Sequence, residues 1–313
     1  MMQKVRDIKL EKKITADGLV RQFYDAGGFS AKKLAVGVNI IEEMFKDKDC
    51  TRFLSLPAAP ISTGMRGVIK DLVKNKQVDV VITTCGLLDH DVARLWKDYY
   101  HGDFMMDDVE LHKKGIYRLG NILVPKESYG EIIEDKVIPV LEKMYKEGKK
   151  QISTKEFVWA LGESMQKEKN REDSIIYWAW KNQIPMFIPG PTDGAVGSQV
   201  WLFSQKHSDF KFDIIADEQE LASIVFDAKK MGALMIGGGI SKHHTIWWAQ
   251  FGGGLEYAVY ITTAVEYDGS LSGAQTREAI SWGKLKEKAK HITIEGDATV
   301  LLPLMLAAVL ERI

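Results

Sequence analysis

The stretch from Ser281 to Lys284 places a lysine directly behind a tryptophan and a glycine, a large ring and a residue with no side chain. The next lysines, Lys286, Lys288 and Lys290, instead belong to a polar run. An amine that lies against apolar surface is more easily held in its neutral form, and a neutral lysine amine is a nucleophile that forms imines. The spacing leaves two interpretations of Lys284 open, a covalent nucleophile and an interface ion pair, and favours the ion pair.

A carboxylate and an indole precede this lysine at helical spacing. A helix that begins near Thr276 would place Glu278 and Trp282 on one face, since they are four residues apart. Together they could hold a cation through the negative charge and the π-face of the ring. The alternative is an exposed glutamate beside a buried tryptophan.

Two adjacent histidines, His243 and His244, follow a glycine turn. Neighbouring side chains on a helix diverge, so we do not expect both to bind one metal ion. One imidazole could accept or donate a proton at a ligand. Capping or packing of one histidine, with the other exposed, is an equally good interpretation.

A second polar cluster, Asp89, His90 and Asp91, comes after an apolar run. A metal site that adds His243 to this cluster lacks a second pair of ligands at helical spacing, so we predict no metal site. A ligand-binding role and a helix N-terminus stabilised by carboxylates are left open.

Short apolar runs alternate with longer amphipathic ones and set the frame for these residues. The clearest helix patterns are Thr63–Gln77 and Thr299–Ile313. Alternation of short buried strands with helices is typical of an α/β, Rossmann-like fold whose mostly parallel sheet is flanked by helices. Without repeats or a linker, we predict a single domain over 1–313, in which 1–30 is an N-terminal extension. The expected strands are Val78–Gly86, Ile184–Gly194, Gly232–Gly239, Tyr257–Ala264 and His291–Ala298.

The expected strands end in small or polar clusters, which read TTCG, PTDG, GGG, ITTA and EGDA. Ligands of open α/β sheets bind beyond the carboxyl ends of the strands, where glycine permits close approach and helix N-termini favour phosphate. The pattern favours a dinucleotide site over ordinary turns. Neither the G-x-G-x-x-G fingerprint nor a P-loop is present, so the turns would be non-standard.

Composition narrows the function classes. The formal net charge of −1 argues against a nucleic-acid partner or an anionic membrane surface, although it is compatible with a local basic patch. Two cysteines, Cys50 and Cys85, argue against a disulfide scaffold and a thiolate zinc site. The N-terminus lacks the apolar core of a signal peptide, and no apolar run has the length of a membrane span. We expect a cytoplasmic protein.

Taken together, several segments resemble the deoxyhypusine synthase family, in an archaeal form, from about residue 50 to the C-terminus. The resemblance implies a transferase with NAD as cofactor and spermidine and the translation initiation factor 5A precursor as partners. NAD oxidises spermidine, an enzyme lysine carries the aminobutyl group as an imine, and one lysine of the precursor receives it. The family is a homotetramer in which an N-terminal segment can cover the active-site entrance, although a plain docking helix is favoured here. The segments are Ser62–Arg66, Val78–Gly86, Gly115–Pro125, Pro191–Gly197, Gly237–His244, Tyr257–Ala274 and Glu278–Lys284.

The resemblance also implies roles for individual residues. Lys284 takes the place of the covalent lysine, and His243 that of the histidine that transfers a proton. The indole of Trp282 would cover the amine, Gly283 would give the backbone room, and a dry pocket would protect the imine. Implied amine contacts are Asp89, Tyr260, Gly269, Ser270, Glu278 and Trp282. Implied NAD contacts are Ser62, Thr84, Cys85, Gly86, His90, Asp193, Gly238, Thr263, Ala264, Asp297 and Ala298.

Three positions depart from the pattern of the eukaryotic enzymes. Ser198, Leu271 and His90 stand where those enzymes carry acidic residues. Because each charged hydrogen bond lost inside a site costs about 1.5–3 kcal/mol, polyamine binding would weaken or change register. A homospermidine-synthase-like or other aminobutyl transferase is therefore one alternative. A catalytically silent NAD-binding subunit is another, and a metal-dependent hydrolase is the most distant.

Overall fold

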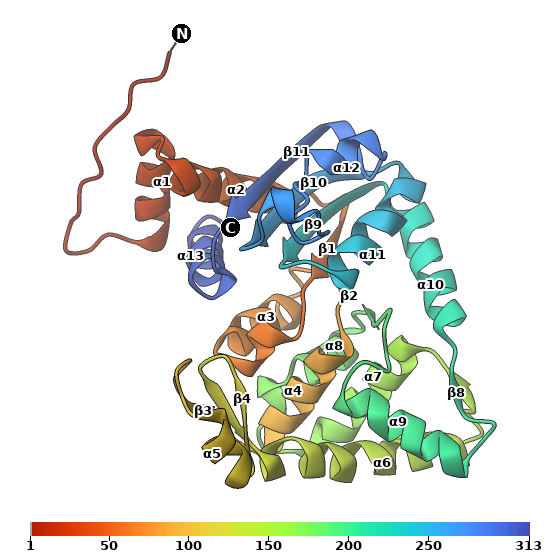
Figure 1. The fold of residues 1–313 in the computed structure, drawn as a ribbon. Coiled ribbons are helices and arrows are strands. Elements are labelled where there is room, and N and C mark those ends of the chain that lie inside the picture. The colour runs from red at the N-terminus through yellow and green to blue at the C-terminus, as the bar shows by residue number, and fades with distance from the viewer. Residues whose placement is uncertain (1) are drawn as a thin grey trace. The chain divides into compact units, whose positions relative to one another are not determined.

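The computed structural model describes residues 2–313, and its internal contacts divide the chain into two compact units (Figure 1). The first unit combines the residues up to Leu56 with Leu221–Ile313, and the second is Pro57–Glu220. The expectation of a single domain stays a prediction, as does a covering role for residues 1–30.

The first unit is built on a parallel sheet of four strands in the order β11-β10-β9-β1. Ser55 pairs with Met235, and Ile236 pairs with Ile261, which brings the carboxyl ends of the strands to one edge. The strands are β1 (Cys50–Ser55), β9 (Lys230–Ile236), β10 (Leu255–Thr262) and β11 (Leu285–Glu295).

Helices flank this sheet. Figure 1 shows α1, α2 and α13 on one side of the strands and α11 on the other. Gly37 of α2 lets the helix approach β10 and β11 closely, since an added Cβ would lie 2.6 Å from Ile294. The helices of this unit are α1 (Ala16–Ala26), α2 (Phe29–Lys46), α11 (Ile240–Ala249), α12 (Glu278–Ser281) and α13 (Ala298–Leu310), and α10 (Ile214–Asp227) begins in the second unit and ends here.

The N-terminal helix α1 is fastened to the end of the chain. Glu311 accepts hydrogen bonds from the amides of Ala16 and Asp17, two donors at the helix start that have no partner within the helix. The buried guanidinium of Arg312 pairs with Asp17 and with Glu42 of α2. The chain end therefore holds α1 against α2 and α13.

The second unit is mostly helical. Its helices are α3 (Met65–Lys74), α4 (Cys85–Trp96), α5 (Asp108–Lys113), α6 (Gly130–Lys146), α7 (Thr154–Ser164), α8 (Ile175–Asn182) and α9 (Ala195–Lys206). Its strands are the parallel pair β2 (Val80–Ile82) and β7 (Met186–Phe187), the antiparallel β3 (Tyr100–His101), β4 (Ile116–Leu119) and β5 (Ile122–Pro125), and the parallel pair β6 (Gln151–Ile152) and β8 (Lys211–Phe212).

The predicted α/β class with a mostly parallel, helix-flanked sheet is confirmed, but several boundaries differ. The expected strands at 78–86 and 184–194 shrink to β2 and β7. Strand β1 was not predicted, and β11 begins at Leu285, within the lysine run, rather than at His291. Such lysines are compatible with its place at the edge of the sheet. The helix expected from Thr276 covers only α12.

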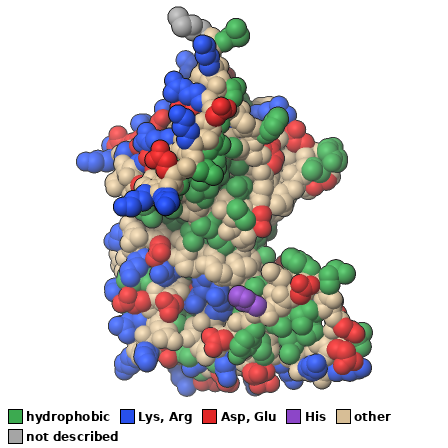
Figure 2. Space-filling model, turned by 90° about the vertical axis from the view of Figure 1, so that its left-hand side faces the viewer, with side chains coloured by type: hydrophobic (Ala, Val, Ile, Leu, Met, Phe, Trp, Pro, Cys, Tyr) green, Lys and Arg blue, Asp and Glu red, His purple; other side chains and the backbone are tan. Residues whose placement is uncertain are grey.

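Charge is mixed on the face of the molecule that Figure 2 shows. On the face shown in Figure 2, basic and acidic side chains are interspersed with apolar ones, in keeping with the net charge of −1. Within residues 2–313, no helix combines the length and the apolar character needed to cross a membrane.

Candidate active site

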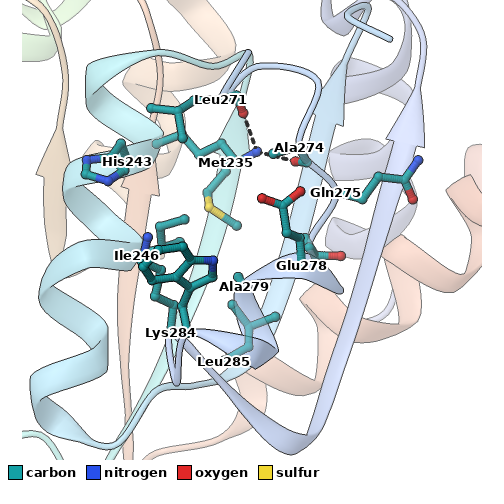
Figure 3. Close-up of a pocket in the computed structure, with 13 residues that line it drawn as sticks. Met235, His243, Ile246, Leu271, Ala274, Gln275, Glu278, Ala279, Lys284 and Leu285 are labelled. Atoms are coloured by element: carbon teal, nitrogen blue, oxygen red, sulfur yellow. Dashed lines mark hydrogen bonds between the residues drawn. The ribbon is translucent and has the colours of Figure 1, made fainter. Parts of the chain in front are cut away.

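A pocket in the first unit brings together residues from β9, α11, the loop after β10, α12 and the start of β11 (Figure 3). It encloses about 40 Å³, the space of one or two water molecules. The lining residues are Met235, Lys242, His243, Ile246, Leu271, Ala274, Gln275, Thr276, Glu278, Ala279, Trp282, Lys284 and Leu285.

Lys284 enters this pocket directly after a left-handed helix end. Gly283 has φ of 69°, and its N–H donates to the carbonyl of Ile280, while the N–H of Lys284 donates to that of Ala279. These two bonds form the Schellman arrangement that ends a helix at a glycine. An added Cβ on Gly283 would meet nothing within 4 Å. The expectation that this glycine gives the backbone room is therefore wrong, and its left-handed conformation is what requires it.

The side chain of Lys284 is only 7% exposed and lies between two indoles. Its ammonium nitrogen is 5.0 Å from the ring centre of Trp282 and 5.5 Å from that of Trp247. Within the described part of the chain, no carboxylate lies at ion-pair distance from this amine. The interface ion pair favoured from spacing thus has no partner within this chain.

His243 stacks on the same Trp247, with ring centres 5.6 Å apart. Burial first, and the nearby Lys284 second, lower the pKa of His243, so its imidazole is neutral at pH 7. Burial lowers the pKa of His244 to about 4, and that side chain does not line the pocket. The two imidazoles diverge as expected, and of the two only His243 lines the pocket together with Lys284.

Glu278 and Trp282 both line the pocket, as the helical spacing predicts. Trp282 is 62% exposed and Glu278 is exposed, so the alternative of a buried tryptophan is wrong. Leu271, one of the departures from the eukaryotic pattern, lines the opposite wall.

Three predicted amine contacts lie behind or beside the pocket and do not line it. Tyr260 is fully buried, and its hydroxyl donates to the carbonyl of Ser272 over 2.7 Å. Gly269 and Ser270 form a turn in which the Ser270 amide donates to Asp268. Their contacts with a substrate stay predictions.

Lys242 is a pocket residue that the sequence reasoning did not single out. Its ammonium donates to the carbonyls of Leu271 and Ala274, over 2.7 and 2.5 Å. The sequence holds a weak signal, a lysine within the glycine-histidine segment 237–244, but nothing in it reveals burial.

In the second unit, the cluster Asp89, His90 and Asp91 lies inside α4 and not at its N-terminus, so the helix-N-terminus interpretation is wrong. Asp89 accepts hydrogen bonds from the amides of Ala195 and Val196 at the start of α9. It also accepts one from the hydroxyl of Tyr129 over 2.6 Å. Its amine-binding role stays a prediction, but its carboxylate already caps α9, and burial raises its pKa.

The neighbours of Asp89 face other partners. His90 shares a hydrogen bond of 3.0 Å with the hydroxyl of Tyr99, and burial lowers its pKa to about 4. Asp91 pairs with Arg66 and accepts a hydrogen bond from the hydroxyl of Ser174. Over residues 2–313, no group of three or more histidine, cysteine or acidic side chains is arranged to hold a metal ion.

The predicted NAD contacts of the first unit follow the carboxyl ends of three adjacent strands. Gly238 follows β9, Thr263 and Ala264 follow β10, and Asp297 and Ala298 follow β11. An added Cβ on Gly238 would lie 2.1 Å from Ser272 Oγ, so only glycine fits there. Asp297 caps α13 through the amide of Thr299.

Two hydroxyls near this edge are buried and have no hydrogen-bond partner among residues 2–313. They belong to Ser55, the last residue of β1, and to Ser241 in the first turn of α11. The start of α11 also lacks a side-chain cap. Unpartnered donors at a helix start suit phosphate and ribose oxygens, so these residues fit a dinucleotide.

The predicted NAD contacts of the second unit lie just before α3, at the start of α4 and just before α9, except His90, which lies inside α4. Burial raises the pKa of Cys85 to about 12, so its thiol is unreactive at neutral pH. Asp193 is exposed and lies just before α9. The set of Ser62, Thr84, Cys85, Gly86, His90 and Asp193 stays a prediction.

Comparison with known proteins decides the family. The family model of deoxyhypusine synthase matches residues 18–309. The chain belongs to the deoxyhypusine synthase family. A "Probable deoxyhypusine synthase" of Picrophilus torridus is 57% identical, over 99% of this chain and 98% of the relative. One of Thermoplasma acidophilum is 54% identical, over 97% of this chain and 96% of the relative.

A solved structure shares the fold of this deoxyhypusine synthase family member. It is the crystal structure of a protein assigned to deoxyhypusine synthase from Entamoeba histolytica, with a TM-score of 0.65 at 18% identity. The match covers 97% of this chain and 96% of that one. The deoxyhypusine synthase family is a family of transferases, so the chain is an enzyme, and the predicted family is confirmed.

Proposed function

We propose that this enzyme transfers the aminobutyl group of spermidine, through an imine on Lys284, to one lysine of the translation initiation factor 5A precursor, with NAD as cofactor. The buried amine of Lys284, which lies between two indoles and has no carboxylate partner in the described chain, carries the proposal. A water-poor site protects an imine from hydrolysis. A homotetramer in the cytoplasm belongs to the same proposal.

The chain offers two groups for a polyamine cation at the pocket mouth. Glu278 supplies a carboxylate, and the exposed face of Trp282 supplies a π-surface. The enclosed 40 Å³ holds only the reacting end of the amine, so the rest of spermidine would extend past Trp282. Leu271 offers no charge on the opposite wall, which motivates the alternative of another amine donor or acceptor.

NAD, when bound, would accept a hydride from the amine carbon of spermidine and return it to the final imine. Ser55, Ser241 and the backbone of Gly238 would hold it at the edge of the sheet described above. His243, which is neutral at pH 7, would accept the proton that the amine nitrogen loses in the oxidation. Lys284 would then add to the carbon of the substrate imine. Both hydrogens of its amine would pass to the nitrogen of the departing fragment, so that the bond from this nitrogen to the aminobutyl carbon breaks and 1,3-diaminopropane leaves.

The test is a borohydride trap. The protein is incubated with NAD and with spermidine labelled in its aminobutyl part, then reduced, digested and mapped by mass spectrometry. We expect one labelled lysine, Lys284, and no label in Lys284→Ala. The matched control is Lys286→Ala, because Lys286 lies only two residues further on, in β11, and its amine is engaged by Glu256 over 2.7 Å.

The outcomes separate the candidate functions. A label on Lys284 that passes to the factor 5A precursor supports the proposal, whereas passage only to free putrescine supports the homospermidine-synthase-like alternative. A folded protein that binds NAD but produces neither NADH nor a label with any polyamine is the silent subunit, and the proposal then fails.

A further inference from the structure

A buried lysine that the proposed chemistry does not use lies next to the reactive one. Lys242 is 3% exposed, on α11. Its ammonium donates to the carbonyls of Leu271 and Ala274, and Figure 3 draws these two bonds as dashed lines. The same nitrogen lies 3.7 Å from the ring centre of Tyr260, beneath it on β10. Two carbonyl acceptors and one ring face thus compensate the ammonium of Lys242 for the water that it loses on burial.

The same loop is held by two further donors. The hydroxyls of Tyr260 and Thr262 both donate to the carbonyl of Ser272, over 2.7 and 2.9 Å. Ser272 also lies against Gly238, where no Cβ would fit. Three side chains from α11 and β10 therefore take up the carbonyls at positions 271, 272 and 274, and we call this set the loop clamp.

The clamped loop forms one wall of the pocket. Leu271 and Ala274 carry two of the clamped carbonyls, and Gln275 and Thr276 follow directly, and all four line the pocket of Lys284. The loop has little regular secondary structure, so the hydrogen bonds of the loop clamp fix the position of this wall of the pocket. Displacement of the wall would change the space beside the amine without touching Lys284.

We propose that Lys242 is a positioning residue, which fixes the loop 271–276 as the substrate-side wall of the Lys284 pocket and thereby sets the affinity for the amine substrate. The substrate part of this inference rests on the proposed function, whereas the loop part does not. Lysine suits the task because an ammonium has three donors, enough for two carbonyls that no single hydroxyl could satisfy together. Charged donors also make stronger hydrogen bonds than neutral ones.

The loop part is tested by hydrogen exchange of the full-length protein, read by mass spectrometry. Lys242→Met keeps the length and apolar stem of the side chain but removes all its donors. We expect peptides covering 270–276 to exchange about tenfold faster, because two charge-assisted hydrogen bonds are lost, with β9 and β10 unchanged. The matched control is Lys230→Met, which removes an ion pair with Asp47 in the same unit, away from the pocket.

The substrate part is tested by the borohydride trap at varied spermidine concentration. We expect Lys242→Met to raise the half-saturating concentration about tenfold, in line with a displaced wall, and to leave the plateau rate of labelling within about threefold. A lower plateau at unchanged half-saturation would overturn the positioning role, since it would place Lys242 in the chemistry. A label absent from the unaltered protein would reject the proposed function, and exchange would still decide the loop part.

A second variant guards against misfolding of the first. Thr262→Val removes one hydroxyl donor to Ser272 at nearly constant shape. We expect a smaller acceleration of exchange over 270–276, together with faster exchange of the Ala264 amide, because the Thr262 hydroxyl also accepts a hydrogen bond from it over 3.1 Å. Unchanged exchange over 270–276 in both Lys242→Met and Thr262→Val would overturn the inference.

Discussion

Gly283 gives the sharpest test of why a glycine precedes the reactive lysine. In Gly283→Ala, the added methyl meets nothing within 4 Å, so a steric clash contributes nothing. The φ of 69° remains unfavourable for any residue with a Cβ, by about 1–2 kcal/mol. We expect the free energy of unfolding to fall by that amount, as measured by urea denaturation.

The same substitution should slow labelling of Lys284. The backbone can relieve the strain by leaving the left-handed conformation, which breaks the bond from the Lys284 amide to Ala279 and moves the amine out from between its two indoles. A shift worth 1–2 kcal/mol corresponds to about a five- to thirtyfold lower rate in the borohydride trap. Gly283→Asn should fall between alanine and glycine, because asparagine tolerates this conformation better.

The matched control is Gly253→Ala. Gly253 has φ of 86°, an added Cβ there also meets nothing within 4 Å, and the residue does not line the pocket. It should lose similar stability and label at the normal rate. The reasoning is refuted if Gly283→Ala costs under about 0.3 kcal/mol, well below the expected strain, or if both variants slow labelling equally.

Three further predictions concern charge. Leu271→Asp should lower the half-saturating spermidine concentration in the borohydride trap about fivefold, a modest gain because the position is 43% exposed. The uncharged control Leu271→Asn should leave this concentration unchanged, and equal behaviour of the two variants would contradict a charge effect. Asp89→Ala should lower the free energy of unfolding, measured by urea denaturation, by about 2–4 kcal/mol, since two amides of α9 and a tyrosine hydroxyl lose their acceptor. A loss under about 0.5 kcal/mol would refute the conclusion that Asp89 caps α9. Burial, the largest cause, lowers the pKa of Lys242 to about 8, so between pH 8 and 10.5 the unfolded chain binds more protons than the folded one. As the pH rises through this range, the unaltered protein should gain up to about 3 kcal/mol of stability relative to Lys242→Met. A difference between the two proteins that stays constant in urea titrations from pH 7 to 10 would contradict this.

The alternation of apolar runs was enough to predict the α/β class. Strands β9 and β10 are covered on both faces, so their residues form continuous apolar runs that can be recognised without a structure. Helices α3 and α13 were located for a similar reason, since each shows an apolar pattern at helical length. Strand β11 was only partly seen, because its first half alternates lysines that face solvent at the edge of the sheet.

Around Lys284, local features of the pocket could be predicted from the sequence, but contacts between distant segments could not. The helical spacing of Glu278 and Trp282 is local, so their common face was predictable, and so was the divergence of His243 and His244. The clamp on the loop was not, because Lys242 meets carbonyls 29 and 32 residues away. Carbonyls occur at every position, so no residue type marks the ones that a buried lysine will meet.

By itself the sequence determined the alternation of elements and the family resemblance, since these depend on local periodicity and on side-chain type, whereas the covalent role of Lys284 stays a prediction that the resemblance implies. Only the tertiary structure decided the direction of side chains in the polar clusters. It turned Asp89 toward the start of α9 and Asp91 toward Arg66, and it brought Lys242 beneath a distant loop. The physical reason is that a buried polar group must find a partner wherever the fold places one, and the location of that partner depends on contacts between segments far apart in the chain.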